Sequence, residues 1–572
     1  MQKRLFAVLS ILLVLSMSLS MVGAQDDAPL PLEAVEGTPR GGTVQVSHRA
    51  QPLWVANFNI LAPDPTPDTQ GLIYEPLMVW NEVDGSKIPW LATSFEWSDD
   101  LRGLTVTLRE GVQWSDGEDF NADDVVYTFN LLRERPELDR GALWQFIESV
   151  EKVDDYTVQF NLSTVNTLGD VQIGQVEPVP EHIYSQVEDP VTFTNENPVG
   201  TGPFANVCRF EEQVYELCAN ENYWIPGLPY VERLRYPGFA GNEQANLAVI
   251  NGETDWAGHF LPDIEQTYVA LDPENNHYYF WPGGDTVSIY MNTEKPPFDD
   301  VAFRQAVSQA IDYESVVGIG MYGYTVPANA TGLGPRYANW VSQEALDTAA
   351  EMGLSTFDSA RAATTLDEAG YVDADGDGWR DNLDGSPIAF NVQVVNGWTD
   401  WVTSVQIISQ NLQEIGVNAQ VVTPEFGDWL NNLQTGTYDM SIGWGSAQFS
   451  PWNYYRELLY SGMIGEDGRA NGVSWARWNS EEVDALIDQF PTTADEAEQM
   501  DIIGQIQNAL VENVVIVPLF PGPTWYEYNT ARFTGFPTEE NYYTQGSPWD
   551  RASNSRLLVA LQIHPNEDMT GE

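Results

Sequence analysis

The chain has 572 residues, of which 84 are acidic and 25 are basic, and its formal net charge at pH 7 is −59. This charge excludes a general nucleic-acid binder, because phosphate backbones attract basic patches. The hydrophobic content of 43% excludes an intrinsically disordered protein. Since a single hydrophobic core stops growing at about 250–300 residues, the length predicts more than one domain.

Residues 1–24 have the three parts of a secretory signal peptide. Lys3 and Arg4 form a positive start, residues 5–19 form an uncharged apolar run, and Val22-Gly-Ala24 supplies small residues for cleavage. A membrane anchor is the alternative, but the run is short for a helix that spans a bilayer. No cysteine lies directly after the apolar run, so the signal of a lipid-anchored protein is missing. We therefore expect an exported protein, periplasmic or extracellular.

Residues 25–40 are acidic and contain proline, which predicts a flexible leader. A helix is expected over 122–133, because Asn121 can cap it and acidic residues occupy its first turn. Strands are predicted at 41–47, 104–109, 156–162, 389–395 and 418–422. Further helices are predicted at 301–311, 359–369, 402–415 and 480–489. Helices interleaved with strands predict an α/β protein.

Cys208 and Cys218 are the two cysteines of the chain. In an exported protein such a pair usually forms a disulfide. The segment between them can turn back as a β-hairpin, so we expect a disulfide across that hairpin. Metal binding and nucleophilic chemistry are the alternatives, but no histidine lies near the pair in the sequence to support them.

A series of motifs follows in order along nearly all of the chain after the signal segment. They are Tyr74-Glu-Pro-Leu77, Trp97-Ser-Asp-Asp100, Trp114-Ser-Asp-Gly117, Phe120-Asn-Ala-Asp-Asp-Val-Val126, Gly200-Thr-Gly-Pro-Phe204, Pro297-Phe-Asp-Asp-Val301 and Arg304-Gln-Ala306. With these motifs the chain resembles the family 5 extracellular solute-binding proteins, which include dipeptide-, oligopeptide-, nickel- and some oligosaccharide-binding components of ABC importers. One such motif alone is weak, whereas the ordered set is specific.

The resemblance implies a two-lobed, periplasmic-binding-protein-like α/β fold with a hinge and an extra subdomain in lobe I. The family pattern assigns 41–75, 198–285 and 527–572 to lobe I, 76–197 to its subdomain, and 286–526 to lobe II. It also implies that the lobes close around a small ligand, which is then delivered to the membrane subunits of an ABC importer. No reaction and no required cofactor are expected, and we expect a monomer.

One segment departs from the peptide-binding members of the family. Those proteins typically hold the ammonium group of the ligand with an Asp shortly after a Gly-Trp dipeptide. The matching segment here is Gly443-Trp-Gly-Ser-Ala-Gln-Phe449, in which Ala447 stands at the Asp position. Because a buried ammonium without a counter-charge is costly, peptide capture is disfavoured. An oligopeptide remains the alternative ligand, with some other acid near its amino group.

Other segments resemble the β-oligosaccharide-binding branch of the family, above all Phe533-Thr-Gly-Phe-Pro-Thr-Glu-Glu-Asn541. Aromatic rings cover the apolar face of a pyranose, while amides and carboxylates pair with its hydroxyls. We therefore expect a β-linked oligosaccharide. The candidate ligand-binding residues are Asn59, Trp256, Trp398, Asp400, Trp401, Trp444 and Trp525. Since the chain has 20 tryptophans, packing is the alternative for each of these rings. A secreted glycoside hydrolase, with a carboxylate pair such as Asp400 and Glu425, is a less favoured function.

An acid-rich loop at 373–384 has the calcium-loop spacing of EF-hands, with Gly378 at the sixth position. The predicted ligands are Asp373, Asp375, Asp377, the backbone carbonyl of Trp379, Asp381 and Asp384. A structural Ca²⁺ is predicted because carboxylates this close repel one another unless a cation joins them. The alternative is a simple turn between a helix and a strand.

Overall fold

The computed structural model describes residues 30–48, 51–283, 285–446, 450–549 and 554–567. The predicted signal peptide, the first part of the leader and Ala447 therefore lie outside the described residues. Among the residues that are described, no helix is long and apolar enough to cross a membrane.

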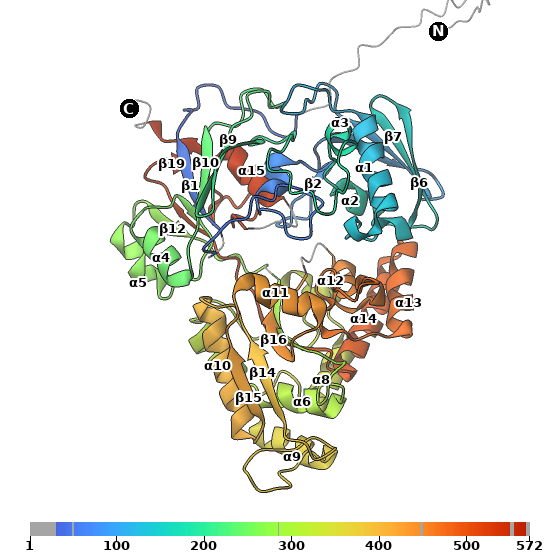
Figure 1. Ribbon diagram of the computed structural model, residues 1–572, viewed down its shortest axis with the longest axis vertical. Helices are drawn as coiled ribbons and strands as arrows, with labels where there is room; N and C mark the ends of the chain where they lie inside the picture. The colour runs from blue at the N-terminus through green and yellow to red at the C-terminus, as the bar shows by residue number, and fades with distance from the viewer. Residues whose placement is uncertain (1–29, 49–50, 284, 447–449, 550–553, 568–572) are drawn as a thin grey trace, which may run out of the picture.

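The chain forms two lobes, one above the other in Figure 1. A seven-stranded sheet with the order β12-β18-β11-β1-β10-β9-β8 organises the upper part, lobe I. Its strands are β1 (Thr43–Ser47), β8 (Asn206–Glu211), β9 (Val214–Cys218), β10 (Arg233–Pro237), β11 (Trp256–Ala257), β12 (Asn276–Tyr278) and β18 (Glu527–Asn529). Its helices are α4 (Asn242–Ile250), α5 (Ile264–Thr267) and α15 (Ser555–Gln562), and a small pair joins β19 (Phe533–Thr534) to β20 (His564–Pro565). Lobe I thus draws its strands from three distant stretches of the chain.

A four-stranded antiparallel sheet with the order β4-β5-β7-β6 forms a subdomain beside the seven-stranded sheet. Its strands are β4 (Ala92–Trp97), β5 (Gly103–Leu108), β6 (Ile147–Asp154) and β7 (Thr157–Leu162), next to the hairpin of β2 (Met78–Trp80) and β3 (Lys87–Pro89). Helix α1 (Ala122–Glu134) packs on this sheet, and α2 (Gly169–Gly174) and α3 (Glu181–Tyr184) follow. The predicted cap of α1 is confirmed as a capping box between Asn121 and Asp124.

Lobe II is built on a five-stranded sheet with the order β15-β14-β16-β13-β17. The strands are β13 (Thr286–Met291), β14 (Ala389–Gln393), β15 (Asn418–Val422), β16 (Met440–Gly443) and β17 (Ile516–Pro521). The helices are α6 (Val301–Ala310), α7 (Tyr313–Ser315), α8 (Gln343–Met352), α9 (Ser359–Ala369), α10 (Thr399–Glu414), α11 (Phe426–Thr435), α12 (Pro451–Leu459), α13 (Glu481–Gln489) and α14 (Glu496–Glu512). Strand β14 runs parallel to both of its neighbours, β15 and β16.

Two connections join the lobes among the described residues, one over 279–283 and 285 and the other over 522–526. They run antiparallel, since Trp281 and Thr524 form a β-bridge and the Gly522 backbone N–H donates to the Asp285 carbonyl at 2.7 Å. The two largest clusters of buried hydrophobic residues are separate, one drawn from 287–520 and the other from 44–256 and 526–563. Two cores joined by a short two-stranded connection confirm the predicted two-lobed α/β fold with a hinge.

Two local expectations concern lobe I. The structure forms the disulfide between Cys208 and Cys218, across the β8–β9 hairpin.

The described part of the predicted flexible leader, residues 30–40, instead lies against lobe I. There the Val35 backbone N–H donates to the Tyr230 hydroxyl at 2.8 Å, and Leu32 and Ala34 pack against the core. The apolar side chains of this segment explain the difference, because they gain contacts that a free leader would lack.

Candidate functional site

Three half-buried aromatic rings form one surface on lobe II, which we call the aromatic platform: Trp398, Phe426 and Trp444. The centroids of the Trp398 and Phe426 rings are 5.9 Å apart, and those of Phe426 and Trp444 are 6.3 Å apart. The planes of these two pairs are inclined by 35° and 19°, so the rings lie closer to parallel than to perpendicular.

Sheet topology explains why rings so far apart in sequence meet. Trp444 directly follows β16, Trp398 lies in the loop after β14, and Phe426 lies after β15, at the first position of α11. These three strands are neighbours and parallel, so their carboxyl ends share one edge of the sheet. Ligands of open α/β sheets bind outside the carboxyl ends of the strands. Figure 1 shows α11 on the edge of lobe II that faces lobe I.

A buried layer of tryptophans supports the platform from below. Trp401, Trp429 and Trp475 belong to the core of lobe II, and the centroids of Trp429 and Trp444 are 4.8 Å apart. The indole N–H of Trp429 donates to the Ser441 hydroxyl at 3.1 Å, which fixes the orientation of that ring. The platform therefore stands on a rigid base, which favours recognition of a flat apolar surface.

Polar side chains border the rings. Asn396, in the loop before Trp398, donates its amide N–H to the Glu425 carboxylate at 2.8 Å, and both side chains are exposed. Asp428, on the first turn of α11, is also exposed. Amides and carboxylates beside aromatic rings offer both contacts that a carbohydrate requires, an apolar cover and hydrogen-bonding groups.

The loop that carries Trp398 also touches lobe I. The backbone N–H of Asn242, at the start of α4, donates to the carbonyl of Gly397 at 3.1 Å. The Asn242 amide donates to the carboxyl of Asp400 at 3.3 Å. Asp400 is only 4% exposed, and burial raises its pKa to about 6. Asp400, predicted as a ligand contact, thus lies where the two lobes meet.

Further contacts join the lobes on the side of the subdomain. The guanidinium of Arg336 stacks on the ring of Trp80, 4.5 Å from its centroid. Arg456, on α12, donates to the carbonyl of Gly141 at 3.2 Å. The backbone N–H of Thr167 donates to the carbonyl of Pro491 at 2.8 Å. The lobes are therefore in contact at several points around their facing edges.

Three residues that were predicted to contact ligand instead make contacts inside lobe I or at the hinge. Asn59 is fully buried, and its amide donates to the Pro190 carbonyl and accepts from the Tyr184 hydroxyl. Trp256 is 1% exposed, and its indole N–H donates to the Gly546 carbonyl at 2.7 Å. Trp525 packs against Phe280 on the hinge. None of the three joins the platform, so we leave them out of the proposed site.

Phe426 is the platform residue that sequence reasoning missed. Its ring follows a short strand and opens a helix, but phenylalanine at such a position usually belongs to the core. The usable signal is positional, because the loops after 389–395 and 418–422 carry aromatic residues just beyond predicted strands. Trp401, by contrast, was predicted to contact ligand and lies in the buried layer, 7% exposed.

Glu457 bears on the alternative ligand. Its carboxyl accepts hydrogen bonds from the Ser446 hydroxyl at 2.6 Å and from the Asn453 amide at 3.1 Å. Burial raises its pKa above the ordinary value. This acid thus contacts Ser446, which directly precedes Ala447 in the sequence, the position at which peptide binders carry their Asp.

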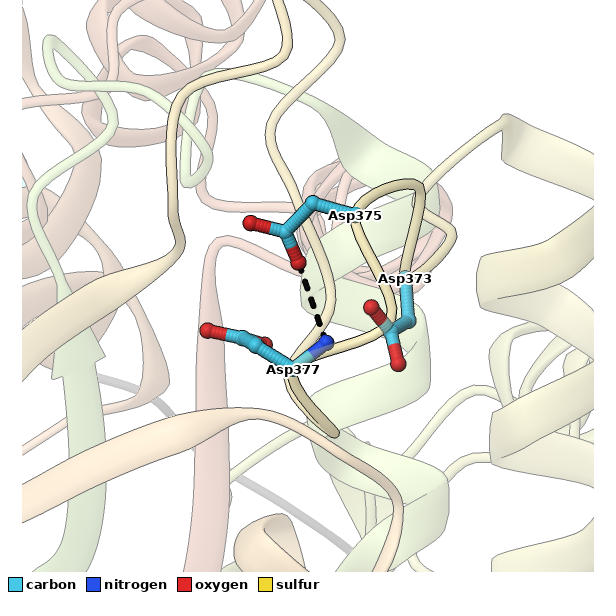
Figure 2. Close-up of side chains that lie close together, drawn as sticks. All are labelled: Asp373, Asp375 and Asp377. Carbon is cyan, nitrogen blue, oxygen red and sulfur yellow. Dashed lines mark hydrogen bonds between the residues drawn. The ribbon is translucent and has the colours of Figure 1, made fainter.

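The acid-rich loop follows α9, at the end of lobe II farthest from lobe I (Figure 1). Figure 2 shows Asp373, Asp375 and Asp377 side by side, with one carboxylate oxygen from each within 4.8 Å of the others. The predicted acids also serve turns: Asp373 accepts from the Gly376 backbone at 2.7 Å, Asp381 accepts from the Ala374 backbone at 2.9 Å, and Asp384 accepts from the Ser386 backbone at 2.9 Å. The structure thus brings together three of the predicted ligands, and a calcium site stays a prediction.

Known structures resemble this chain over nearly its whole length. A periplasmic oligopeptide-binding protein of an oligopeptide ABC transporter from Thermotoga maritima, with mannohexaose bound, has a TM-score of 0.85 and 26% identity, covering 92% of this chain and 99% of its own. The oligopeptide-binding protein AppA from Bacillus subtilis, in complex with a nonapeptide, shares the fold with a TM-score of 0.78 and 20% identity, covering 93% of this chain and 100% of its own.

Sequence relatives agree with the structural ones. The oligopeptide-binding protein AppA of Bacillus subtilis is 25% identical over 533 residues, which cover 90% of this chain and 92% of AppA. Heme-binding protein A of Haemophilus influenzae is 27% identical over 459 residues, which cover 76% of this chain and 79% of that protein. The sequence model of one family matches residues 87–466, more than half of the chain. The protein belongs to the bacterial extracellular solute-binding proteins, family 5.

Proposed function

We propose that this protein is an exported, non-enzymatic solute-binding component of an ABC importer, and that it captures an oligosaccharide between its two lobes. The observation that carries the proposal is the aromatic platform at the carboxyl ends of three parallel strands. Its rings stay partly exposed, and α11, which begins at Phe426, lies on the edge of lobe II that faces lobe I, where a ligand would contact both lobes.

The chemistry of the platform favours a sugar over a peptide. Rings inclined by 19° to 38° present a broad apolar surface, which suits the C–H faces of successive pyranose units. Exposed amide and carboxylate groups at its border suit the hydroxyls. A ligand that touches both lobes shifts the equilibrium toward the closed arrangement, and no bond has to be made or broken.

The relative from Thermotoga maritima with mannohexaose bound supports this ligand class, since it resembles the chain over nearly its whole length. Peptide capture is the second candidate function. The names of several relatives favour it, and so does the carboxyl of Glu457, which could serve as the counter-charge for a peptide ammonium group. In either case the cargo is a small molecule handed to the membrane subunits of the importer.

Calorimetric titration of the mature protein tests the proposal, with mannohexaose, β-linked di- to pentasaccharides and mixed di- to pentapeptides as ligands. We expect saturable binding of an oligosaccharide, recovered unchanged by chromatography. Trp444→Ala should weaken that binding at least about tenfold, because an aromatic contact contributes about 1.5 kcal/mol beyond the area it buries. Trp340→Ala is the matched control, since Trp340 is another half-buried ring of lobe II but lies outside the platform.

Each other outcome has a definite meaning. Peptide binding with no response to sugars would overturn the ligand assignment and favour the second candidate function. Equal losses in the Trp444→Ala and Trp340→Ala variants would contradict the role of the platform. Cleaved sugar in the recovered sample would contradict the non-enzymatic proposal and indicate a glycoside hydrolase.

A further inference from the structure

The contact between the lobes at Asn242 has an unusual composition, because a carboxyl is buried in it and no cation among the described residues forms an ion pair with it. Asp400 lies in the first turn of α10, and its carboxyl accepts from the Asn242 amide of lobe I. Asp400 is 4% exposed, and Asn242 is 6% exposed. Around them the backbones of Gly241 and Gly397 approach so closely that a Cβ at position 241 would lie 3.1 Å from the Gly397 Cα.

Among the described residues, the elements with the most contacts to the helix of Asp400 supply no counter-charge. Helix α10 contacts η5 (Val316–Gly320) and β15, neither of which carries a charged residue. On α6 the guanidinium of Arg304 is bound to the carbonyls of Phe298 and Asn513. On α4 the neighbour of Asn242 is Glu243, an exposed acid of like charge. A charged carboxylate in such surroundings is penalised, whereas the neutral acid fits.

We propose that Asp400 is a positioning residue for the binding site, which docks lobe II on lobe I through Asn242 and couples protonation to closure of the lobes. The inference rests on the proposed function only in assuming that the lobes open and close. Trp398 of the platform lies directly before α10, two residues before Asp400, so docking at Asn242 fixes one side of the platform relative to lobe I.

The direction of the pH effect follows from the two environments. Burial raises the pKa of Asp400 to about 6 when the lobes are in contact, and separation of the lobes returns the carboxyl toward its ordinary value of 3.8. The contact state therefore binds a proton more tightly, and protonation favours closure. Between pH 7 and pH 5 the closure equilibrium should rise about tenfold, with most of the change between pH 6 and pH 5.

The test measures closure without any ligand. The native cysteines are paired in the disulfide, so Glu212→Cys in lobe I and Glu414→Cys in lobe II supply the only thiols for a fluorescent donor and acceptor. Both positions are exposed. We expect the closed fraction to rise from pH 7 to pH 5 in the otherwise native protein. Asp400→Asn should remain mostly closed at both pH values, because it keeps the amide contact and carries no charge.

A second variant separates positioning from a merely structural role. Asn242→Ala removes the lobe I partner and should lower the closed fraction at both pH values, while cooperative unfolding in urea checks that each variant folds. A native protein whose closed fraction is the same at pH 5 and pH 7 would overturn the proposal, as would an Asp400→Asn variant that retains the pH response. Because no sugar is present, failure here is distinct from failure of the oligosaccharide proposal, which is read from titration with mannohexaose.

Discussion

Gly241→Val adds a side chain between the lobes at the point where their backbones are in contact. Gly241 has a φ of 170°, an extended backbone that valine adopts without strain. Its new Cβ would lie 3.1 Å from the Gly397 Cα and 3.2 Å from the Gly397 carbonyl oxygen. Both atoms belong to the backbone and cannot rotate away, so the two loops must move apart.

The magnitude follows from the hydrogen bonds that such a movement breaks. The bond from the Asn242 N–H to the Gly397 carbonyl is 3.1 Å long, and the bond from its amide to Asp400 is 3.3 Å long. A displacement of a few tenths of an ångström breaks the longer bond first. Loss of one neutral bond costs about 1 kcal/mol, and loss of both costs about 2 kcal/mol. Closure, and with it ligand affinity, should weaken by about five- to 30-fold.

The assay is the closed fraction of the doubly labelled protein, followed by titration with the oligosaccharide that the native protein binds. Gly318→Val is the control, because a Cβ at position 318 has no heavy atom within 4 Å and the residue lies outside the lobe contact. We expect the free energy of unfolding of each lobe to stay unchanged in both variants. Native affinity in Gly241→Val would refute the argument that this backbone contact forms part of the closed state.

Two further predictions concern stability. Burial raises the pKa of Glu527 to about 8, and its Oε1 has no hydrogen-bond partner among the described residues. Because the folded pKa exceeds the unfolded one, stability is full below about pH 4.5 and is lost as the pH rises through 8. At pH 8 the free energy of unfolding in urea should therefore be at least about 1 kcal/mol higher for Glu527→Gln than for the native protein, with little difference at pH 4.5. Equal urea-unfolding curves at pH 8 would contradict this prediction. In the acid-rich loop, Ca²⁺ at a hundred times its Kd should add about 2.7 kcal/mol to the free energy of unfolding. Asp373→Asn should abolish this gain, whereas Asp347→Asn, a change at an exposed acid on α8, should retain it. An equal response to Mg²⁺ or an unaffected Asp373→Asn variant would argue for a simple turn.

Local signals in the sequence predict most of the regular elements. The helix at 359–369 and the strand at 418–422 have the predicted bounds, since a capping residue or an apolar run marks each end. Helix α10 begins at Thr399 instead of 402, because residues 397–401 were assigned to a ligand loop. Helices α11, α12 and α14 were not predicted.

The candidate site is harder to predict, because it is assembled by topology. Trp398 and Trp444 were both predicted to contact ligand and lie together in the structure, but nothing in the sequence places Phe426 beside them. That neighbour relation requires the strand order β15-β14-β16, in which chain segments about 30 residues apart become adjacent. The contact of Asp400 with Asn242 requires in addition the relative placement of two lobes, which local patterns do not encode.

Tryptophans that look equivalent in the sequence differ in how deeply the structure buries them. Trp398 and Trp401 are three positions apart, yet Trp398 lies on the half-exposed platform and Trp401 lies beneath it in the core of lobe II. Removing the Trp401 side chain would leave a cavity under the platform and destabilise lobe II, so a loss of ligand binding in that variant would follow from either role. Removing the Trp444 side chain leaves the buried layer of Trp401, Trp429 and Trp475 in place. The half-exposed rings are therefore the positions at which ligand contact and folding can be measured separately.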